Sequence, residues 1–171
     1  MTNLIKRKLK FVNKTLNKEV REIIQLNYLS WPDHGAPEQS DYQIIKSLIA
    51  FINEHHPGQN KEMQANSKIV FHCSAGIGRT GTIIAIYNII ESLRILIENG
   101  GDSSTPRISI FSVVRRLREQ RYCMVQSVSQ YEFIYEYILD HLSSEGMVTL
   151  KFPRNTFGLD DIEQEREDSG S

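Results

Sequence analysis

The feature that most constrains the fold is a short apolar run that leads into a glycine-rich loop and then into a long apolar segment. Ile69-Val70-Phe71 is wholly apolar, which is typical of a buried strand. Cys73 follows, and a turn of small residues leads into a helix that we expect from about Gly81 to Glu98, ended by Asn99-Gly100-Gly101. The sequence therefore predicts a strand, a turn and a helix, with a cysteine at the turn.

This turn has the chemistry of an anion site. Small residues let successive backbone N–H groups point toward one place, and the helix N-terminus adds partial positive charge. Cys73 lies at the edge of this site, so the same field favours its thiolate; cysteines in such settings have a pKa of roughly 3.5 to 7.5, against about 8.5 when free. Arg79 can hold two phosphoryl oxygens with its planar guanidinium. Thr80 can donate a hydrogen bond to the sulfur, and His72 can orient the loop.

Two other interpretations of the turn compete with this one. Taken alone, Cys73 is an ordinary core cysteine, and Gly76 and Gly78 merely make a turn. A nucleotide-binding P-loop is the nearest chemical rival, but Arg79 stands where its lysine is required and no glycine lies at the required distance upstream. The combination of nucleophile, small residues and arginine between a strand and a helix favours the anion site.

Hydrophobic periodicity and turn residues predict the other elements. We expect strands at 4–12 and 20–29, a loop at 31–37, and helices at 41–54, 109–120 and 128–142. Ser109 is a plausible cap of the basic helix, and Ser127 with Gln130 has the spacing of a capping box. Residues 151–171 are acidic and poor in apolar side chains, so we predict one domain over 1–150 followed by a disordered tail.

Composition excludes several classes of function. The chain has 171 residues, 40% of them hydrophobic, and a formal net charge of -1, so no global field attracts nucleic acid. Its two cysteines, Cys73 and Cys123, are too few for a disulfide-stapled secreted domain, and we expect reduced thiols and a cytoplasmic location. The apolar stretch from Ile83 to Ile97 is interrupted by polar and charged residues, so we predict no membrane segment. The histidines show no metal-ligand spacing, and we expect neither metal nor cofactor.

Three motifs together resemble one family. His72-Cys73-Ser74-Ala75-Gly76-Ile77-Gly78-Arg79-Thr80-Gly81 resembles the signature of the classical, cysteine-dependent protein tyrosine phosphatases. Trp31-Pro32-Asp33-His34-Gly35 is similar to the general-acid loop of that family, and Val125-Gln126-Ser127-Val128-Ser129-Gln130-Tyr131 to its glutamine loop. The resemblance spans residues 4–142 and implies an α/β fold, a twisted mixed sheet flanked by helices, without the N-terminal part of the family's catalytic domain.

The resemblance also implies roles for single residues. Cys73 would be the nucleophile and Asp33 the general acid, while Gln126 would position the water that hydrolyses a cysteinyl-phosphate. Arg79 and the loop residues would bind the phosphate of a phosphotyrosine-containing protein, together with Asp33 and Gln126; these loop residues are Ser74, Ala75, Gly76, Ile77 and Gly78. Gln130 would assist or would only cap its helix.

Several alternatives stay open from the sequence. Arg118 and Arg121 would support the loop, as in the family, or would belong to a solvated basic face. The chain would dephosphorylate phosphotyrosine in signal transduction, or it would be a truncated, weakly active or inactive module of the same fold that binds phosphate or phosphotyrosine. A dual-specificity or lipid phosphatase is a weaker third reading.

Overall fold

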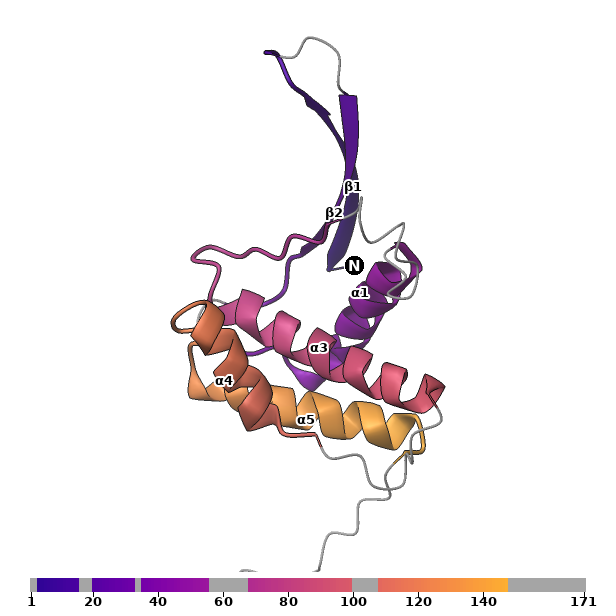
Figure 1. The fold of residues 1–171 in the computed structure, drawn as a ribbon, viewed down its shortest axis with the longest axis vertical. Coiled ribbons are helices and arrows are strands. Elements are labelled where there is room, and N and C mark those ends of the chain that lie inside the picture. Colours follow the sequence, from indigo (N-terminus) through magenta and orange to yellow (C-terminus); the bar gives the residue numbers. More distant parts are fainter. Residues whose placement is uncertain (1–2, 16–19, 33–34, 56–67, 100–107, 148–171) are drawn as a thin grey trace, which may run out of the picture.

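The computed structural model describes residues 3–15, 20–32, 35–55, 68–99 and 108–147. Two strands, β1 (Leu4–Val12) and β2 (Val20–Tyr28), pair antiparallel, with Leu4 opposite Tyr28 and Val12 opposite Val20. Figure 1 shows this hairpin as an arm that extends well beyond the helices. Both predicted strands are confirmed to within one residue.

The helices also lie where the sequence predicts them. They are the 3₁₀ turn η1 (Gln39–Asp41) and the α-helices α1 (Tyr42–His55), α3 (Gly78–Glu98), α4 (Ile110–Gln120) and α5 (Val128–Ser144). The Ser109 side chain accepts the backbone N–H of Ser112 and caps α4. Ser127 and Gln130 form the predicted capping box at the start of α5. These starts were predictable because each depends on residues only a few positions apart.

The core lies where α3 packs against α4 and α5 (Figure 1). α1 packs against α5, since the Tyr42 ring lies 5.6 Å from Phe133 and 5.2 Å from Tyr137, centroid to centroid. The largest fully buried side chains include Ile45 of α1, Ile86 and Ile89 of α3, and Phe133 and Ile134 of α5. By length and composition α3 is the one helix of the described residues that could cross a membrane. Its apolar side chains are explained by their burial in the core, because α3 packs against α4 and α5.

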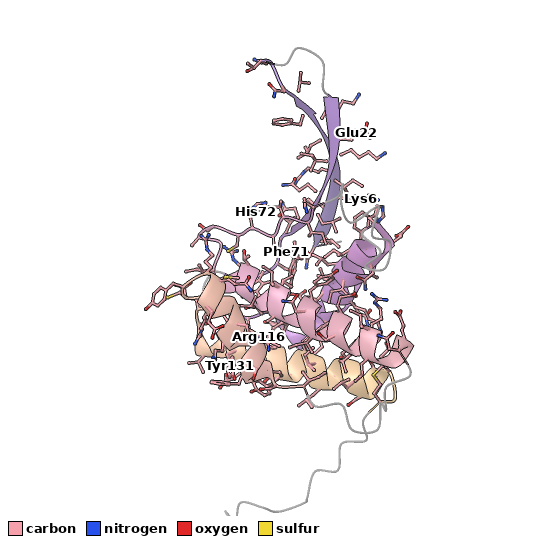
Figure 2. The ribbon with its side chains drawn as sticks, in the orientation of Figure 1. Lys6, Glu22, Phe71, His72, Arg116 and Tyr131 are labelled. Atoms are coloured by element: carbon pink, nitrogen blue, oxygen red, sulfur yellow. The ribbon has the colours of Figure 1, made fainter. Side chains whose placement is uncertain are left out.

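The base of the hairpin is attached to α1. The Tyr28 hydroxyl donates a 2.7 Å hydrogen bond to Asp41, directly before α1. The Lys6 ammonium lies 4.4 Å from the ring centroid of Phe51, in cation–π contact. Beyond these contacts the side chains of β1 become exposed, as the stick view in Figure 2 shows for the upper part of the arm.

One predicted element is wrong. Ile69-Val70-Phe71 is not a strand, and the Val70 side chain is 80% exposed. Its apolar character predicted burial within a sheet, but the sheet of the described residues contains only β1 and β2, so no neighbouring strand pairs with it. The α/β architecture stands, with a small antiparallel sheet in place of the expected mixed one. The polar segment 59–67, most of the hairpin turn and the tail 151–171 lie outside the described residues.

Candidate active site

The cysteine loop, residues 72–78, curls around the sulfur of Cys73 at the start of α3. The backbone N–H of Gly76 donates to Cys73 Sγ at 3.2 Å. Gly76 has φ +70°, a left-handed conformation that favours glycine, so the residue type is needed for this turn. The loop thus brings the predicted nucleophile and the helix N-terminus together.

The surroundings of Cys73 favour its thiolate. Partial burial by itself would raise the pKa of the thiol. The Thr80 hydroxyl and the backbone N–H groups of Thr80, Gly76 and Ile77 oppose that effect and lower the pKa of Cys73 to about 7. At neutral pH the sulfur is therefore charged in a large fraction of molecules, which a nucleophile requires.

The Thr80 hydroxyl lies next to the Cys73 sulfur and has no other hydrogen-bond partner among the described residues. The residue is 7% exposed, and its Oγ1 has no hydrogen bond of good geometry within the described part of the chain. It is nevertheless close enough to Cys73 to favour the charged form of the sulfur. A buried, unsatisfied hydroxyl costs free energy, so its persistence beside the thiol fits a donor that acts on a charged sulfur.

Two arginines at the end of α4 hold the two loops, Arg121 the cysteine loop and Arg118 the start of the glutamine loop, residues 125–131. Arg121 Nη2 donates to the carbonyl of Ala75 at 3.1 Å. Arg118 donates from Nε to the Met124 carbonyl and from Nη2 to the Val125 carbonyl, both at 2.9 Å. Of the two readings left open by the sequence, the geometry favours loop support for both arginines.

The backbone around the residues that Arg118 holds is unusual. Cys123 and Val125 have φ of 62° and 60°, in the left-handed region that non-glycine residues seldom adopt. Val125 is fully buried, and its N–H donates to the carbonyl of Ile77 at 3.1 Å. A Cβ atom on Gly81 would lie 2.5 Å from the Val125 nitrogen, so α3 and this loop approach as closely as backbone allows.

Gln130 connects three segments. Its Oε1 accepts the backbone N–H of Gln126 at 3.0 Å and that of Ser127 at 3.3 Å, and its Nε2 donates to the carbonyl of Gly35 at 3.3 Å. It is 2% exposed. The amide of Gln126 approaches the start of α3, because a Cβ on Gly78 would lie 3.2 Å from Gln126 Oε1. Gln130 therefore does more than cap α5, and its link to Gly35, 95 residues away, had no signal in the sequence.

Trp31 anchors the loop that carries Asp33. Its indole N–H donates to the carbonyl of Gly35 at 2.9 Å, and its ring packs 6.1 Å from Phe133, centroid to centroid. The side chain is 7% exposed. Asp33 and His34 themselves lie outside the described residues, so the structure fixes the two ends of this loop and not the predicted general acid.

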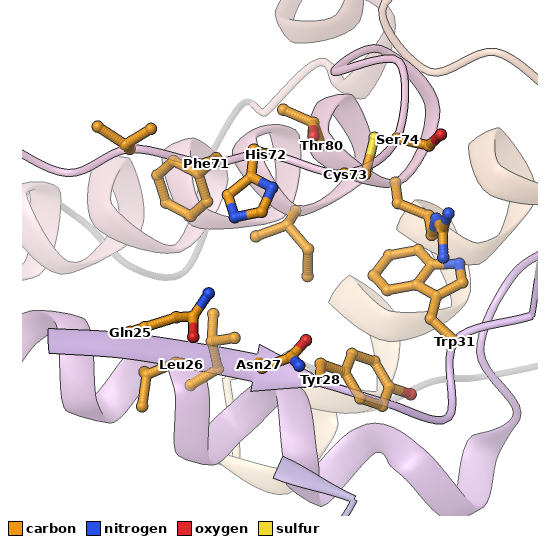
Figure 3. Close-up of a pocket in the computed structure, with 14 residues that line it drawn as sticks. Gln25, Leu26, Asn27, Tyr28, Trp31, Phe71, His72, Cys73, Ser74 and Thr80 are labelled. Atoms are coloured by element: carbon orange, nitrogen blue, oxygen red, sulfur yellow. The ribbon is translucent and has the colours of Figure 1, made fainter. Parts of the chain in front are cut away.

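A cavity of about 310 Å³ lies beside the cysteine loop. Figure 3 shows it between β2, with Gln25 to Tyr28, and the segment with Phe71 and His72. Cys73 and Ser74 of the cysteine loop line the cavity as well, and the Cys73 sulfur points away from β2 (Figure 3). Arg79 and Thr80 also line it.

The remaining predicted residues differ in exposure. Ser74, Ala75 and Gln126 are exposed, Ile77 and Arg79 are half-buried, and Gly78 is buried. His72 is exposed at the entrance of the loop. No group of three or more histidine, cysteine, aspartate or glutamate side chains in the described ranges could hold a metal ion.

Comparison with known proteins agrees with this geometry. The sequence profile of the family described as "Protein-tyrosine phosphatase" matches residues 1–140. The chain belongs to the protein-tyrosine phosphatase family. The predicted resemblance is thereby confirmed.

Individual relatives give the same result. Tyrosine-protein phosphatase 3 of Dictyostelium discoideum is 40% identical over 134 residues, which are 78% of this chain and 13% of that protein. Phosphatidylinositol phosphatase PTPRQ of Homo sapiens is 35% identical over 122 residues, 71% of this chain and 4% of that protein. Among solved structures, one titled as the structural basis of the PTPN18 fingerprint on distinct HER2 tyrosine phosphorylation sites has a TM-score of 0.60 and 28% identity, and it covers 84% of this chain and 45% of that one. This chain thus spans less than half the length of each of these three proteins.

Proposed function

We propose that this chain hydrolyses phosphotyrosine in proteins through a cysteinyl-phosphate intermediate. The observation that carries the proposal is the state of Cys73: its sulfur accepts a backbone N–H inside the loop, and its pKa is lowered to about 7. A thiolate held at a helix N-terminus is the nucleophile that phosphoryl transfer from a tyrosyl ester needs.

In the first step the Cys73 thiolate attacks phosphorus, an S–P bond forms, and the P–O bond to the tyrosyl oxygen breaks. Asp33 protonates the departing oxygen, which would otherwise leave as a phenolate. Arg79 and the backbone N–H groups of residues 74–79 bind the equatorial oxygens, best when charge is spread over them in the transition state. The loop is shaped before substrate arrives, so little reorganisation accompanies the reaction.

In the second step water attacks the phosphorus, the S–P bond breaks, and inorganic phosphate leaves. Gln126 holds that water, and Asp33 accepts its proton. The buried Thr80 hydroxyl donates to the sulfur as Cys73 becomes a thiolate again. The hydrogen bonds of Gln130 to the backbone of Gln126 and to Gly35 support this step, because they tie the water-holding loop to the loop that carries Asp33.

The proposed substrate is a phosphotyrosine-containing protein of the cytoplasm, where the chain acts in signal transduction. Reduced cysteines support this location, since a nucleophilic thiol is preserved in reducing compartments. Family membership supports the substrate class. The reaction requires neither metal nor cofactor, because the loop and Arg79 supply the charge that stabilises the transition state.

The test compares the chain of residues 1–171 with its Cys73→Ser variant on p-nitrophenyl phosphate and on a phosphotyrosine peptide. Cys73→Ser should abolish turnover, and Asp33→Ala should slow the chemical step by a factor of about 10² to 10⁴. Cys123→Ser is the matched control and should turn over like the unchanged chain. Equal turnover by Cys73→Ser and the unchanged chain would refute the assignment.

One structural observation favours a second candidate, a module that binds phosphate or phosphotyrosine with little turnover. The segment before Cys73 is not held in a sheet, and Val70 is 80% exposed. A loop supported mainly by Arg121 and by Val125 can bind an anion without holding transition-state geometry. Near-zero rates combined with vanadate binding by titration calorimetry would select this candidate, and a phosphoinositide substrate in the same assay would detect lipid phosphatase activity.

A further inference from the structure

Asp41 is bonded to residues on both sides of the general-acid loop, residues 31–37. It follows this loop in the turn η1, and one of its carboxylate oxygens accepts two hydrogen bonds from residues that precede the loop. The Tyr28 hydroxyl donates to Asp41 Oδ2 at 2.7 Å, and the Ser30 hydroxyl donates to the same oxygen at 3.2 Å. The backbone N–H of Asp41 donates to the Glu38 carbonyl at 2.9 Å. The carboxylate therefore joins the two ends of the loop.

The surroundings of Asp41 suit a carboxylate that accepts hydrogen bonds. Hydrogen bonds to an ionised acceptor are roughly twice as strong as those between neutral groups. Burial and the hydrogen bond to Asp41 both raise the pKa of Tyr28, so its hydroxyl stays a donor at neutral pH. α1 begins at Tyr42, directly after Asp41, and the partial positive charge of a helix N-terminus favours a carboxylate there.

Aromatic contacts extend this attachment to Trp31, on the general-acid loop itself. The Tyr28 ring lies 5.7 Å from the Trp31 ring, centroid to centroid, and Figure 3 shows the two side by side. Tyr42, the first residue of α1, lies 5.6 Å from Phe133, whose ring lies 6.1 Å from Trp31. The Trp31 indole in turn donates to the carbonyl of Gly35, across the loop. Both aromatic neighbours of Trp31 are thus connected to the start of α1.

We propose that Asp41 is a positioning residue for the general acid: by fixing Tyr28 and Ser30 it holds Trp31, and with it the loop on which Asp33 lies. The inference rests on the proposed function, in which Asp33 protonates the tyrosyl oxygen. Displacing a catalytic group by about 1 Å can cost roughly 100-fold in rate. Asp41 acts only through these contacts, so its loss should impair proton transfer more than the other parts of the reaction.

The dependence of kcat/KM on the leaving group tests this role in the chain of residues 1–171. Phenyl phosphate releases a strongly basic phenolate, since a phenol such as tyrosine has a pKa of about 10, and it therefore needs the general acid. p-Nitrophenyl phosphate releases a much weaker base and needs the acid less. Asp41→Ala should lower kcat/KM about 10- to 100-fold on phenyl phosphate and at most about threefold on p-nitrophenyl phosphate.

Two further variants control for the substitution. Asp41→Asn keeps an oxygen that can accept both hydrogen bonds, and its kcat/KM on phenyl phosphate should stay within about threefold of the unchanged chain. Glu38→Ala removes an exposed carboxylate from the same segment and should change kcat/KM on neither substrate. Loss of leaving-group selectivity is therefore expected only where the acceptor at position 41 is removed.

Trp31 supplies a second measurement that needs no turnover. It is the single tryptophan of the chain, and its side chain is 7% exposed. Acrylamide quenching of its fluorescence should increase roughly twofold or more in Asp41→Ala, because the indole becomes accessible once its neighbours are released. Quenching in Glu38→Ala should equal that of the unchanged chain.

Equal losses of kcat/KM on the two phosphates would overturn the inference, since they would mean that Asp41 only joins the hairpin to α1. Unchanged quenching of Trp31 in Asp41→Ala would overturn it as well. If the unchanged chain hydrolyses neither phosphate, the proposed function fails and the quenching alone decides whether Asp41 positions the loop. If Asp41→Ala fails to fold by circular dichroism, Tyr28→Phe decides in both assays, because it keeps the ring beside Trp31 and removes only the hydroxyl.

Discussion

Replacing Gly81 with alanine should destabilise the protein, although alanine is the better helix former. In an unobstructed helix interior, alanine is more favourable than glycine by about 0.8 to 1.0 kcal/mol. At Gly81, however, the new Cβ would lie 2.5 Å from the Val125 nitrogen and 3.1 Å from the Met124 carbonyl carbon. Both are backbone atoms, so no side chain can turn aside, and α3 must separate from the glutamine loop.

Forcing extra volume into a packed site costs typically about 1 to 3 kcal/mol, and here the obstacle is backbone, which places the cost at the upper end. Subtracting the helix-propensity gain leaves a net loss of about 1 to 2 kcal/mol. In urea denaturation, where the slope is typically about 1 to 3 kcal/mol per molar, the midpoint should fall by roughly 0.5 to 1 M. Turnover should also fall, because Val125 precedes Gln126 and is bonded to the cysteine loop through Ile77.

The matched control is Asn88→Ala, an exposed position on the same helix. It should leave the urea midpoint unchanged or raise it slightly, because only helix propensity changes. If Gly81→Ala raised the midpoint as Asn88→Ala does, the close approach of α3 to the glutamine loop would be refuted, and with it the argument that this contact positions Gln126.

Three further predictions concern the site. The rate of Cys73 alkylation by iodoacetamide should rise with pH and reach half its maximum near pH 7, and a midpoint at pH 8.5 would contradict the hydrogen bonds to the sulfur. Because the pKa of Cys73 is lower in the folded than in the unfolded chain, its thiolate stabilises the fold. This stabilisation is fully present above about pH 8.5 and is lost as the pH falls through about 7. Arg118→Ala should lower kcat more than it raises KM, since it frees the carbonyls of Met124 and Val125, whereas Arg115→Ala, which removes only an exposed ion pair with Glu119, should change neither constant by more than about twofold. Hydrogen peroxide should inactivate the enzyme, and dithiothreitol should restore its activity. The rate of inactivation should fall below pH 6, because the fraction of Cys73 present as thiolate falls there. Inactivation at equal rates at pH 5 and pH 8 would point to another target.

The sequence predicts features that depend on contacts between residues close together in the chain, and it fails to predict those that depend on distant ones. Ser109 and the Ser127–Gln130 box mark helix starts because cap and backbone lie within a few residues. The apolar run at 69–71 predicts a strand that the structure lacks, since burial of a strand depends on neighbouring strands and not on its own side chains.

The same limit applies to the site. Cys73 and the small residues around it are contiguous, so their shared chemistry is visible in the sequence. Arg115 and Arg118 are alike in sequence, one helical turn apart, and only the fold makes one an exposed ion-pair partner and the other a support of the glutamine loop. The bond from Gln130 to Gly35 spans 95 positions and has no local signature.

The left-handed residues Cys123 and Val125 have a consequence for the evolution and engineering of this loop. A β-branched residue in that conformation costs roughly 1 to 3 kcal/mol, and the Arg118 guanidinium and the Ile77 carbonyl hold it there. Glycine at position 125 would remove the torsional cost. It would also let the backbone at this position rotate more freely, so the residues before Gln126 would no longer keep a single conformation. Because Val125 is fully buried, loss of its side chain costs about 1.5 to 3 kcal/mol, as much as the torsional relief gains. Substitutions that relax this backbone should therefore orient water less well without making the chain more resistant to heat.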